Sequence, residues 1–494
     1  LMLRYLFIIS LTILLFSCKK DISNDGSWQN LRFSNDTVIF DTTFQSIGTT
    51  TKTLKVYNRS KADIYTDISL EENMQGSFRI NVDGFSGNNF ENIFIGAKDS
   101  IFIFIEVTPN LSSNNFLLEN KLQFNTNGNI QNIPIISPYR DAYFHIRKKN
   151  FFLNGSDTIV YRYYPISTNT VWTNDKPHVI VGDLVIEPNA TLTIEAGTQI
   201  HFYENSSFYV GNPILVSSSS VPQNNGSLIL NGSLGDEIIF QGYRTEEWYK
   251  DMPGQWGFIY FAPGSSNNSI NHAIIKNGTT GLRADSLVSS SPVLTINNTE
   301  IKNMSAIGID ARGSSLKAYN TEISNCGLYS VSLRWGGNYS FAHCTFANYW
   351  SIMNISSIRS TPSLLLNNYY EDINGVQINR NLDEATFTNC IIYGNLVTEV
   401  SFQNGNQSNF NYQFDHCLLK LDNSVNLSTP EFINCIRNEN PNFVDLFEYN
   451  FNIDSISPAR YSGNSSALNE FILMSDKNGV LRTSPPDIGA YQYN

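Results

Sequence analysis

The chain has 494 residues, enough for two or three domains that each bury a core of their own. Charged residues make up only 15% of it and aromatic residues 13%, a composition typical of exported proteins rich in strands and turns. The formal net charge of −12 argues against a nucleic-acid partner, because binding to phosphates needs clustered Lys and Arg. After the first 16 residues, no apolar run is long enough to cross a bilayer.

The first 26 residues have the pattern of an export signal followed by a tether. Arg4 precedes a short apolar run at residues 5–16. The segment Leu15-Phe16-Ser17-Cys18 resembles the lipobox of bacterial lipoproteins, in which the cysteine is acylated and becomes the first mature residue. The resemblance implies a signal peptide at 1–17, lipid on Cys18, a tether at 18–26 and attachment to the outer membrane, with the chain facing the cell surface. The alternative is an ordinary signal peptide that happens to contain a cysteine.

Residues 27–145 show short alternating strands separated by turn signals, as expected for a β-sandwich of about seven strands. Expected strands include residues 37–40, 53–57, 78–82 and 100–105. The segments 36–42, 78–84 and 127–129 resemble the immunoglobulin-like (Ig-like) module of Bacteroidota surface lipoproteins. Such a module implies a spacer or a binding domain and no particular chemistry.

A repeat then returns every 18 to 27 residues, each copy anchored on an Asn or a His. Apolar residues stand two places before each anchor and usually one and three places after it. The strand alternation of inward and outward side chains therefore shifts by one residue at the anchor, so the chain must bend there. Asn tolerates the left-handed backbone that such a bend needs. A further Asn often follows five places on, so each repeat has the form of one coil of a parallel β-helix. The anchors are His272, Asn298, Asn320, His343, Asn368, Asn389, His416 and Asn434.

The segments on either side of the repeat extend the same fold. Residues 182–198 resemble the first coil of right-handed parallel β-helix proteins of the pectate-lyase-like superfamily, and residues 440–491 resemble their closing segment. We therefore expect an all-β chain: an Ig-like sandwich at 27–145, a right-handed parallel β-helix at 146–438 and a C-terminal cap at 439–494. The cap is expected to cover the open pairing edge of the last coil.

Cysteines and histidines of the repeat occupy structural positions. Cys344, Cys390, Cys417 and Cys435 share one inward position, which predicts stacked free thiols rather than disulfides, because parallel side chains disfavour the bond. The anchor histidines are several coils apart, too far to share one metal ion. We expect no metal site among them.

The resemblance to polysaccharide lyases and hydrolases raises the question of an active site. We find no catalytic motif, and therefore predict no catalytic residue and no cofactor except, as one alternative, calcium. Glu300 and Glu322 share an outward position on neighbouring coils, where they could bind calcium or simply be solvated. Trp248 and Trp335 lie in loop-like segments, where they could stack on sugars or pack on the coil surface.

Six Asp-Ser or Asp-Thr pairs resemble the acceptor motif for periplasmic O-glycosylation in Bacteroidota. The alternative is that Asp followed by Ser or Thr simply begins strands well. The candidate acceptors are Thr37, Thr42, Ser100, Thr158, Ser286 and Ser455.

Two functions remain open at this point. The first is a non-catalytic, lipid-anchored surface protein whose rigid β-helix serves as a binding or scaffold subunit beside an outer-membrane β-barrel or another surface protein. The second is a carbohydrate-active enzyme or a glycan-binding protein. The scarcity of paired acids within the coils favours the first.

Overall fold

The computed structural model describes residues 30–71, 76–110, 117–153, 159–213, 224–285, 292–353, 358–405 and 407–494. The chain divides into two compact units, residues 1–141 and 142–494. The predicted signal peptide, Cys18 and the predicted tether lie outside the described residues, as do Thr158 and Ser286. Within the described ranges, no helix has both the length and the apolar character needed to span a membrane.

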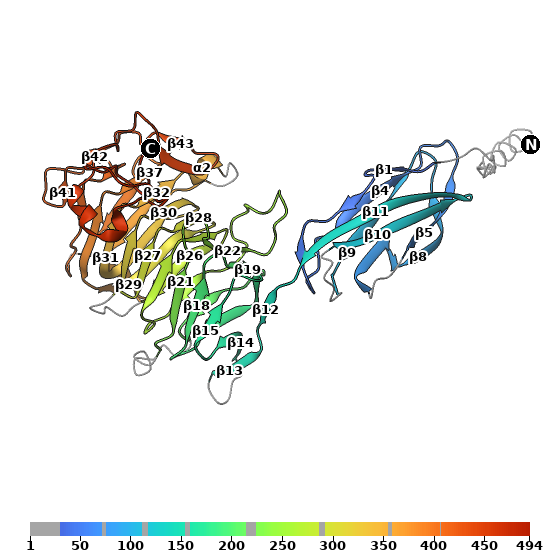
Figure 1. Cartoon of the computed structure of the whole chain (residues 1–494), viewed down its shortest axis with the longest axis horizontal. Helices are drawn as coiled ribbons and strands as arrows, with labels where there is room; N and C mark the ends of the chain where they lie inside the picture. The colour runs from blue at the N-terminus through green and yellow to red at the C-terminus, as the bar shows by residue number, and fades with distance from the viewer. Residues whose placement is uncertain are drawn as a thin grey trace, which may run out of the picture. The chain divides into compact units, whose positions relative to one another are not determined.

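The first unit is a β-sandwich of two sheets (Figure 1). Strands alternate between buried and exposed side chains, and β9 shows the pattern clearly: Ile101, Ile103 and Ile105 are buried while Phe102 and Phe104 face outward. The predicted sandwich is confirmed, with eleven strands among its described residues where the sequence indicated about seven. One sheet has the order β1 (Arg32–Phe33), β4 (Lys52–Tyr57), β9 (Ser100–Val107), β6 (Phe78–Val82), β7 (Phe85–Gly87); the other has β2 (Val38–Ile39), β11 (Asn129–Arg140), β10 (Leu117–Thr126), β5 (Ile64–Leu70), β8 (Asn89–Ile95), with β3 (Thr43–Phe44) beside β11.

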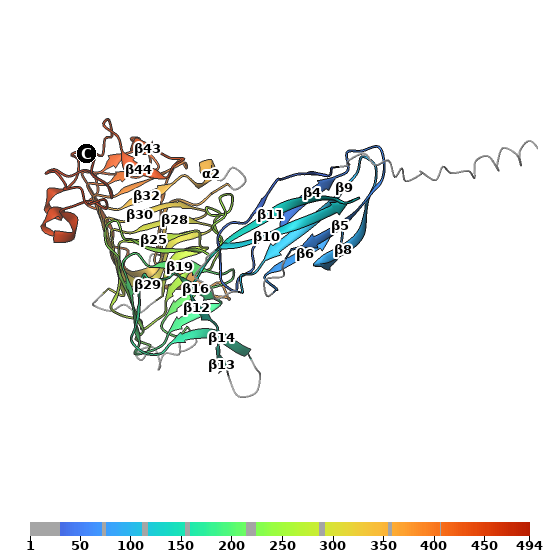
Figure 2. The ribbon, with the colours of Figure 1, turned by 45° about the vertical axis from the view of Figure 1, so that its right-hand side comes forward.

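The second unit is the right-handed parallel β-helix that the sequence predicts, with coils stacked in chain order (Figures 1 and 2). Each complete coil contributes a strand to three faces. The first face contains β14 (Ile159–Ile166), β17 (Asp183–Ile186), β20 (Phe208–Val210), β23 (Ile259–Phe261), β26 (Thr280–Asp285), β33 (Leu364–Asn367) and β38 (Val400–Gln403). The second contains β15 (Thr170–Trp172), β18 (Thr191–Glu195), β21 (Ser227–Asn231), β24 (Asn268–Asn271), β27 (Leu294–Asn297), β36 (Leu382–Thr388), β39 (Gln413–Asp415) and β41 (Phe432–Ile433).

Two long strands, β29 (Ile307–Tyr319) and β31 (Val331–Ala342), run through both of these faces, so the first and second faces form one 18-stranded sheet. This sheet begins with a hairpin of β13 (Lys149–Leu153) and β14. The third face is a separate 11-stranded sheet, seen in Figure 2. It contains β12 (Tyr143–Ile146), β16 (His178–Val181), β19 (Gln199–Phe202), β22 (Ile238–Gly242), β25 (Ala273–Lys276), β28 (Glu300–Met304), β30 (Glu322–Cys326), β32 (Thr345–Asn348), β37 (Ile391–Gly394), β40 (Leu418–Leu419) and β42 (Ile436–Arg437).

The anchors of the repeat form the corner between the second and third faces. Seven of the eight have the left-handed backbone that the pattern predicts, with φ between 45° and 53°. Their side chains also form hydrogen-bonded ladders between coils: the Asn320 amide donates to Asn298 at 3.0 Å, and the Asn389 amide lies 2.8 Å from Nε2 of His343. The anchors therefore both turn the chain and tie neighbouring coils together.

The eighth anchor was assigned wrongly. Asn368 follows β33, and Leu366 pairs with Leu333 on the first face rather than with Phe341 on the second. The true counterpart of Phe341 in the next coil is Phe387. The error arose because a hairpin of β34 (Tyr369–Glu371) and β35 (Gln377–Asn379) is inserted at the corner between the first and second faces, which made one coil look like two.

The interior of the β-helix is a continuous stack of like residues. Phe341, Phe387, Phe414 and Phe432 lie ring over ring, with centroids 5.2, 4.7 and 5.6 Å apart in turn. The four repeat cysteines are free thiols, as predicted; Cys344, Cys390 and Cys417 are buried and Cys435 is half-buried. Stacking keeps each aromatic ring out of water while preserving its contacts above and below.

The C-terminal segment covers the outer side of the third face. Phe451, Ile488 and Tyr491 pack on Ala347 and Ile391, and all five are buried. The segment includes β43 (Phe443–Asp445), β44 (Asn450–Ile453), η3 (Ser465–Asn469) and η4 (Phe471–Leu473). Strands such as β37, with apolar side chains on both faces, indicate in the sequence that the outer side is also buried. The short α2 (Trp350–Met353) follows β32.

Candidate functional site

The outer side of the first face carries a ladder of charged residues on neighbouring coils. Strand β26 contains Arg283-Ala284-Asp285 and strand β29 contains Asp310-Ala311-Arg312, and the two tripeptides are aligned in register. Each charge therefore faces an opposite charge across the strands, while the alanines point into the core. Tyr260 of β23 is paired with Arg283, and Arg334 of β31 with Arg312, so the ladder spans four coils.

Ion pairs hold this ladder in place. Arg334 contacts Asp310 through two nitrogens, Nε at 3.0 Å and Nη2 at 2.5 Å, and the Asp310 side chain is only 7% exposed. Asp285 accepts from Arg283 Nη2 and from the Tyr260 hydroxyl, each at 2.9 Å. Its other oxygen, Oδ1, is buried and has no hydrogen-bond partner within the described part of the chain. This oxygen therefore keeps a hydrogen-bonding capacity that the described residues do not use.

Trp335 adds an aromatic group at the edge of the ladder, on strained backbone. Its φ is 56°, and Gly336 and Gly337 follow at 68° and 125°. A left-handed backbone is unusual for so bulky a residue, and such strain is concentrated at binding and catalytic sites. The three residues form an irregularity in β31 that displaces the pairing with β29 and β36. The Trp335 ring contacts that of Tyr370 edge-on at 5.3 Å.

Of the residues described above, Arg312, Arg334, Trp335 and Tyr370 line a cavity of about 310 Å³, which we call the first-face groove. Asn367 accepts from the backbone N–H of Trp335 at 3.3 Å and donates to Gln403 at 3.0 Å. The guanidinium of Arg380 lies 4.9 Å from the centre of the Trp335 ring. The groove is lined by Arg312, Arg334, Trp335, Leu365, Asn367, Tyr369, Tyr370 and Gln403. Arginine forks, amides and aromatic rings are groups that bind carboxylates and sugar rings.

Electrostatics keep the tyrosine of the ladder protonated. Burial, followed by the negative charge of Asp285, raises the pKa of the Tyr260 hydroxyl. Tyr260 is therefore a hydrogen-bond donor at neutral pH and unsuited to act as a base.

The predicted pair Glu300 and Glu322 is brought together, but in an environment that the sequence did not indicate. The two are aligned on β28 and β30, and Glu322 is buried rather than solvated, because the C-terminal segment covers it. Tyr491 donates a hydrogen bond to Glu322, while Lys302 and Lys477 pair with Glu300. The pair thus joins the cap to the third face. Within the described residues, no group of three or more His, Cys, Asp or Glu is placed to hold a metal ion.

The predicted tryptophans lie at different sites. Trp335 lines the first-face groove, whereas Trp248 is 66% exposed in a loop between β22 and β23. The guanidinium of Arg244 lies 4.9 Å from the Trp248 ring. Other residues of that loop, Glu247, Lys250 and Asp251, line a separate cavity with Lys276 and Lys302.

Four of the candidate O-glycosylation residues lie within the described ranges. Thr37 and Thr42 are half-buried near β2, Ser100 is half-buried at the start of β9, and Ser455 is exposed in a turn. Glycosylation of these residues remains a prediction.

The sequence interpretation missed the ladder. The repeat marks only the corner between the second and third faces, whereas Asp285 and Asp310 lie on the first face. The usable signal was the pair of reversed tripeptides, Arg-Ala-Asp at 283–285 and Asp-Ala-Arg at 310–312, spaced as one coil. The bulge at Trp335 gives a weaker signal, the Gly-Gly that follows it.

Comparisons with known proteins add little to this geometry. No protein-family model matches the chain, and no curated protein matches it. A protein of unknown function from Porphyromonas gingivalis W83 aligns with 24% of this chain and 61% of its own, at 9% identity and a TM-score of 0.17. The periplasmic alginate epimerase AlgG aligns with 55% of this chain and 78% of its own, at 10% identity and a TM-score of 0.24. The catalytic domain of a GH87 alpha-1,3-glucanase, in complex with tetrasaccharides, aligns with 78% of this chain and 87% of its own, at 10% identity and a TM-score of 0.18.

Proposed function

We propose that the β-helix unit binds a carboxylated polysaccharide along the outer side of its first face. The observation that carries the proposal is the first-face groove, in which Trp335 and Tyr370 lie beside the side chains of Arg312 and Arg334. An extended glycan suits this surface, because the same positions recur on successive coils and could contact successive sugars.

The charge of the groove favours an anionic ligand. The described residues that line it include two arginines and no carboxylate, in a chain whose net charge is −12. The side chains of Arg312 and Arg334 are each 42% exposed, so both can reach a ligand while they remain paired with aspartates. A planar guanidinium can bind a carboxylate through two parallel hydrogen bonds.

Binding is better supported than bond cleavage. Asp310 is held by Arg334, and Tyr260 stays protonated, so neither is suited to be a base. The one observation that favours an enzyme is Oδ1 of Asp285, which lies beside the Tyr260 hydroxyl and has no hydrogen-bond partner among the described residues. A lyase or hydrolase is therefore the second candidate function.

The proposal is tested by titrating the purified chain with polygalacturonate and alginate. We expect Arg312→Ala and Trp335→Ala each to weaken binding at least tenfold, about 1.4 kcal/mol, and added salt to weaken it further. Lys317→Ala is the matched control, because Lys317 is exposed on the second-face part of the same strand, β29. Equal affinity in all variants would refute the proposal, and release of shortened or unsaturated products would favour the enzyme.

We further propose that lipid on Cys18 anchors the chain to the outer membrane and presents the groove at the cell surface. The lipobox-like segment supports the anchor, and binding of an external glycan gives surface exposure a purpose. An accessory role beside an outer-membrane β-barrel is compatible with this location. Mild-detergent purification through a C-terminal tag tests that role, and a chain that purifies alone would count against it.

A further inference from the structure

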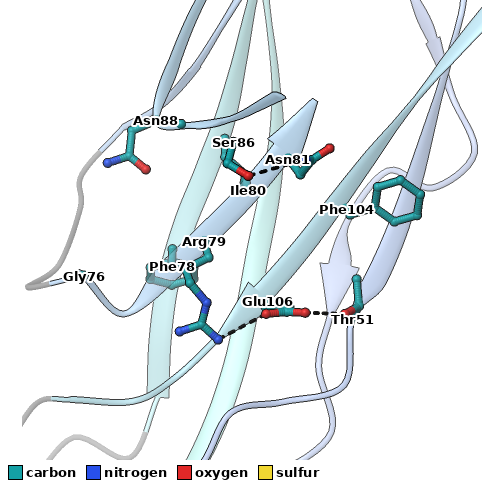
Figure 3. A pocket seen from close by; sticks show the side chains of 11 residues that line it. Thr51, Gly76, Phe78, Arg79, Ile80, Asn81, Ser86, Asn88, Phe104 and Glu106 are labelled. Carbon is teal, nitrogen blue, oxygen red and sulfur yellow. Dashed lines mark hydrogen bonds and ion pairs between the residues drawn. The ribbon is translucent and has the colours of Figure 1, made fainter. Parts of the chain in front are cut away.

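The sandwich unit contains a cavity of about 470 Å³ on the outer side of its β1-β4-β9-β6-β7 sheet, which we call the sandwich pocket (Figure 3). Side chains from β6, β7 and β9 and from the residue before β4 line it. It lies in a different unit from the first-face groove, so its ligand is a separate question. The lining residues used below are Thr51, Arg79, Asn81, Ser86, Phe104 and Glu106.

A row of polar groups crosses the floor of the pocket. Arg79 Nη2 lies 3.1 Å from Glu106 Oε2, and Thr51 donates to the other oxygen of Glu106 (Figure 3). Hydrogen bonds from Thr51 and then Arg79 lower the pKa of Glu106, so the carboxylate is charged at neutral pH. The side chains of Arg79 and Glu106 remain 55% and 41% exposed. Next to them, the Asn81 amide donates to Ser86 at 3.2 Å.

This floor suits a neutral ligand. The charges of Arg79 and Glu106 compensate each other, so an ionic ligand would face one attractive and one repulsive group at similar distances. A ligand with neighbouring hydroxyl groups, each both donor and acceptor, can instead bond to the guanidinium and to the carboxylate together. Amide and hydroxyl groups of Asn81 and Ser86 extend the same mixed character.

An aromatic ring forms one side of the pocket. Phe104 lines it and is 42% exposed, and Phe102, two places earlier on β9, is 44% exposed with its ring plane within 16°. Two such rings on the solvent side of one strand expose apolar surface to water, and exposed apolar patches of this kind are common at binding sites. The C–H face of a pyranose ring packs well on such a ring while its hydroxyl groups reach the polar floor.

We propose that the sandwich pocket binds a sugar unit of a neutral polysaccharide, with Phe104 stacked on the ring and the Arg79–Glu106 pair bonded to neighbouring hydroxyl groups. The chain would then carry two glycan sites of different charge preference, one on each unit.

The test is calorimetric titration of the full chain with four neutral hexasaccharides: cellohexaose, xylohexaose, mannohexaose and laminarihexaose. We expect at least one to bind, and Phe104→Ala and Glu106→Gln each to weaken that binding tenfold or more. Phe94→Ala is the matched control, because Phe94 is 51% exposed on β8 of the other sheet and does not line the pocket. Arg312→Ala, which affects only the first-face groove, should leave neutral-sugar binding unchanged.

Three results would overturn the proposal. The first is that none of the four hexasaccharides binds the unmodified chain. The second is that Phe104→Ala and Phe94→Ala have equal effects, whether both are silent or both abolish binding. The third is that Arg312→Ala removes the binding, which would assign the neutral sugar to the β-helix. If the unmodified chain binds a neutral hexasaccharide but no polyuronate, the proposed function is refuted and the proposal for the sandwich pocket stands.

Discussion

The buried pair beneath the cap predicts opposite effects for two matched substitutions. Burial, and then the neighbouring charge of Glu300, raises the pKa of Glu322 from the ordinary 4.5 to about 7. For Glu300, burial alone would raise the pKa, but Lys302 and Lys477 outweigh it and lower it. Glu322 thus prefers to be neutral in the folded chain, while Glu300 prefers to be charged.

The sign of the pH dependence follows. Between pH 4.5 and 7 the folded chain holds a proton on Glu322 that the unfolded chain has lost, so the free energy of unfolding decreases as the pH rises through this window. At about 1.4 kcal/mol per pH unit, the loss amounts to about 3 kcal/mol by pH 8. Glu322→Gln cannot ionise and should avoid this loss. Glu300→Gln should instead destabilise the chain at pH 8, because Lys302 and Lys477 lose their buried partner.

Urea unfolding at pH 5 and pH 8 measures both effects. We expect Glu322→Gln to unfold like the unmodified chain at pH 5 and to be more stable by up to about 3 kcal/mol at pH 8. A Glu322→Gln variant that is less stable than the unmodified chain at pH 8 would show that the charged carboxylate stabilises the cap, which is the opposite of this reasoning.

Four further predictions concern the core, the groove and the N-terminus. Phe387→Ala should lower the free energy of unfolding by about 3–5 kcal/mol in urea, because it opens a gap in the aromatic stack. Gly337→Ala should distort the first-face groove and reduce polyuronate binding in calorimetry, because its φ is 125° and a Cβ there would lie 2.5 Å from the Ser314 carbonyl oxygen. Cys18→Ala should abolish palmitate labelling and either release the protein from the membrane fraction or leave an uncleaved precursor. Intact-mass analysis should show added glycan, expected on Thr37, Ser100 or Thr158; a mass equal to that of the bare lipidated chain would exclude it.

The β-helix could be predicted from the sequence because each coil repeats the same local physics. An Asn or His with left-handed backbone turns the chain at the corner between the second and third faces, and the residues around it alternate inward and outward. Asn389 and His343 could therefore be assigned from spacing alone. Asn368 could not, since the inserted hairpin imitates the same pattern at a different corner.

The groove and the burial of the acid pair could not be predicted, because both depend on contacts between distant segments. Glu322 has the sequence pattern of an outward residue, and only Tyr491, 169 residues later, makes its position buried. Trp335 meets Tyr370 and Arg380 through the same inserted hairpin that obscured the repeat. The charges of the ladder were visible in the sequence, but their alignment required the register of the first face.

The most direct test of the proposed function is a crystal structure of the chain with a hexauronate. We expect the sugar to lie along the first face, with a carboxylate between Arg312 and Arg334 and a ring against Trp335. A hexauronate bound on the second or third face, or one found cleaved beside Asp285, would contradict the assignment of this groove as a non-catalytic glycan-binding site.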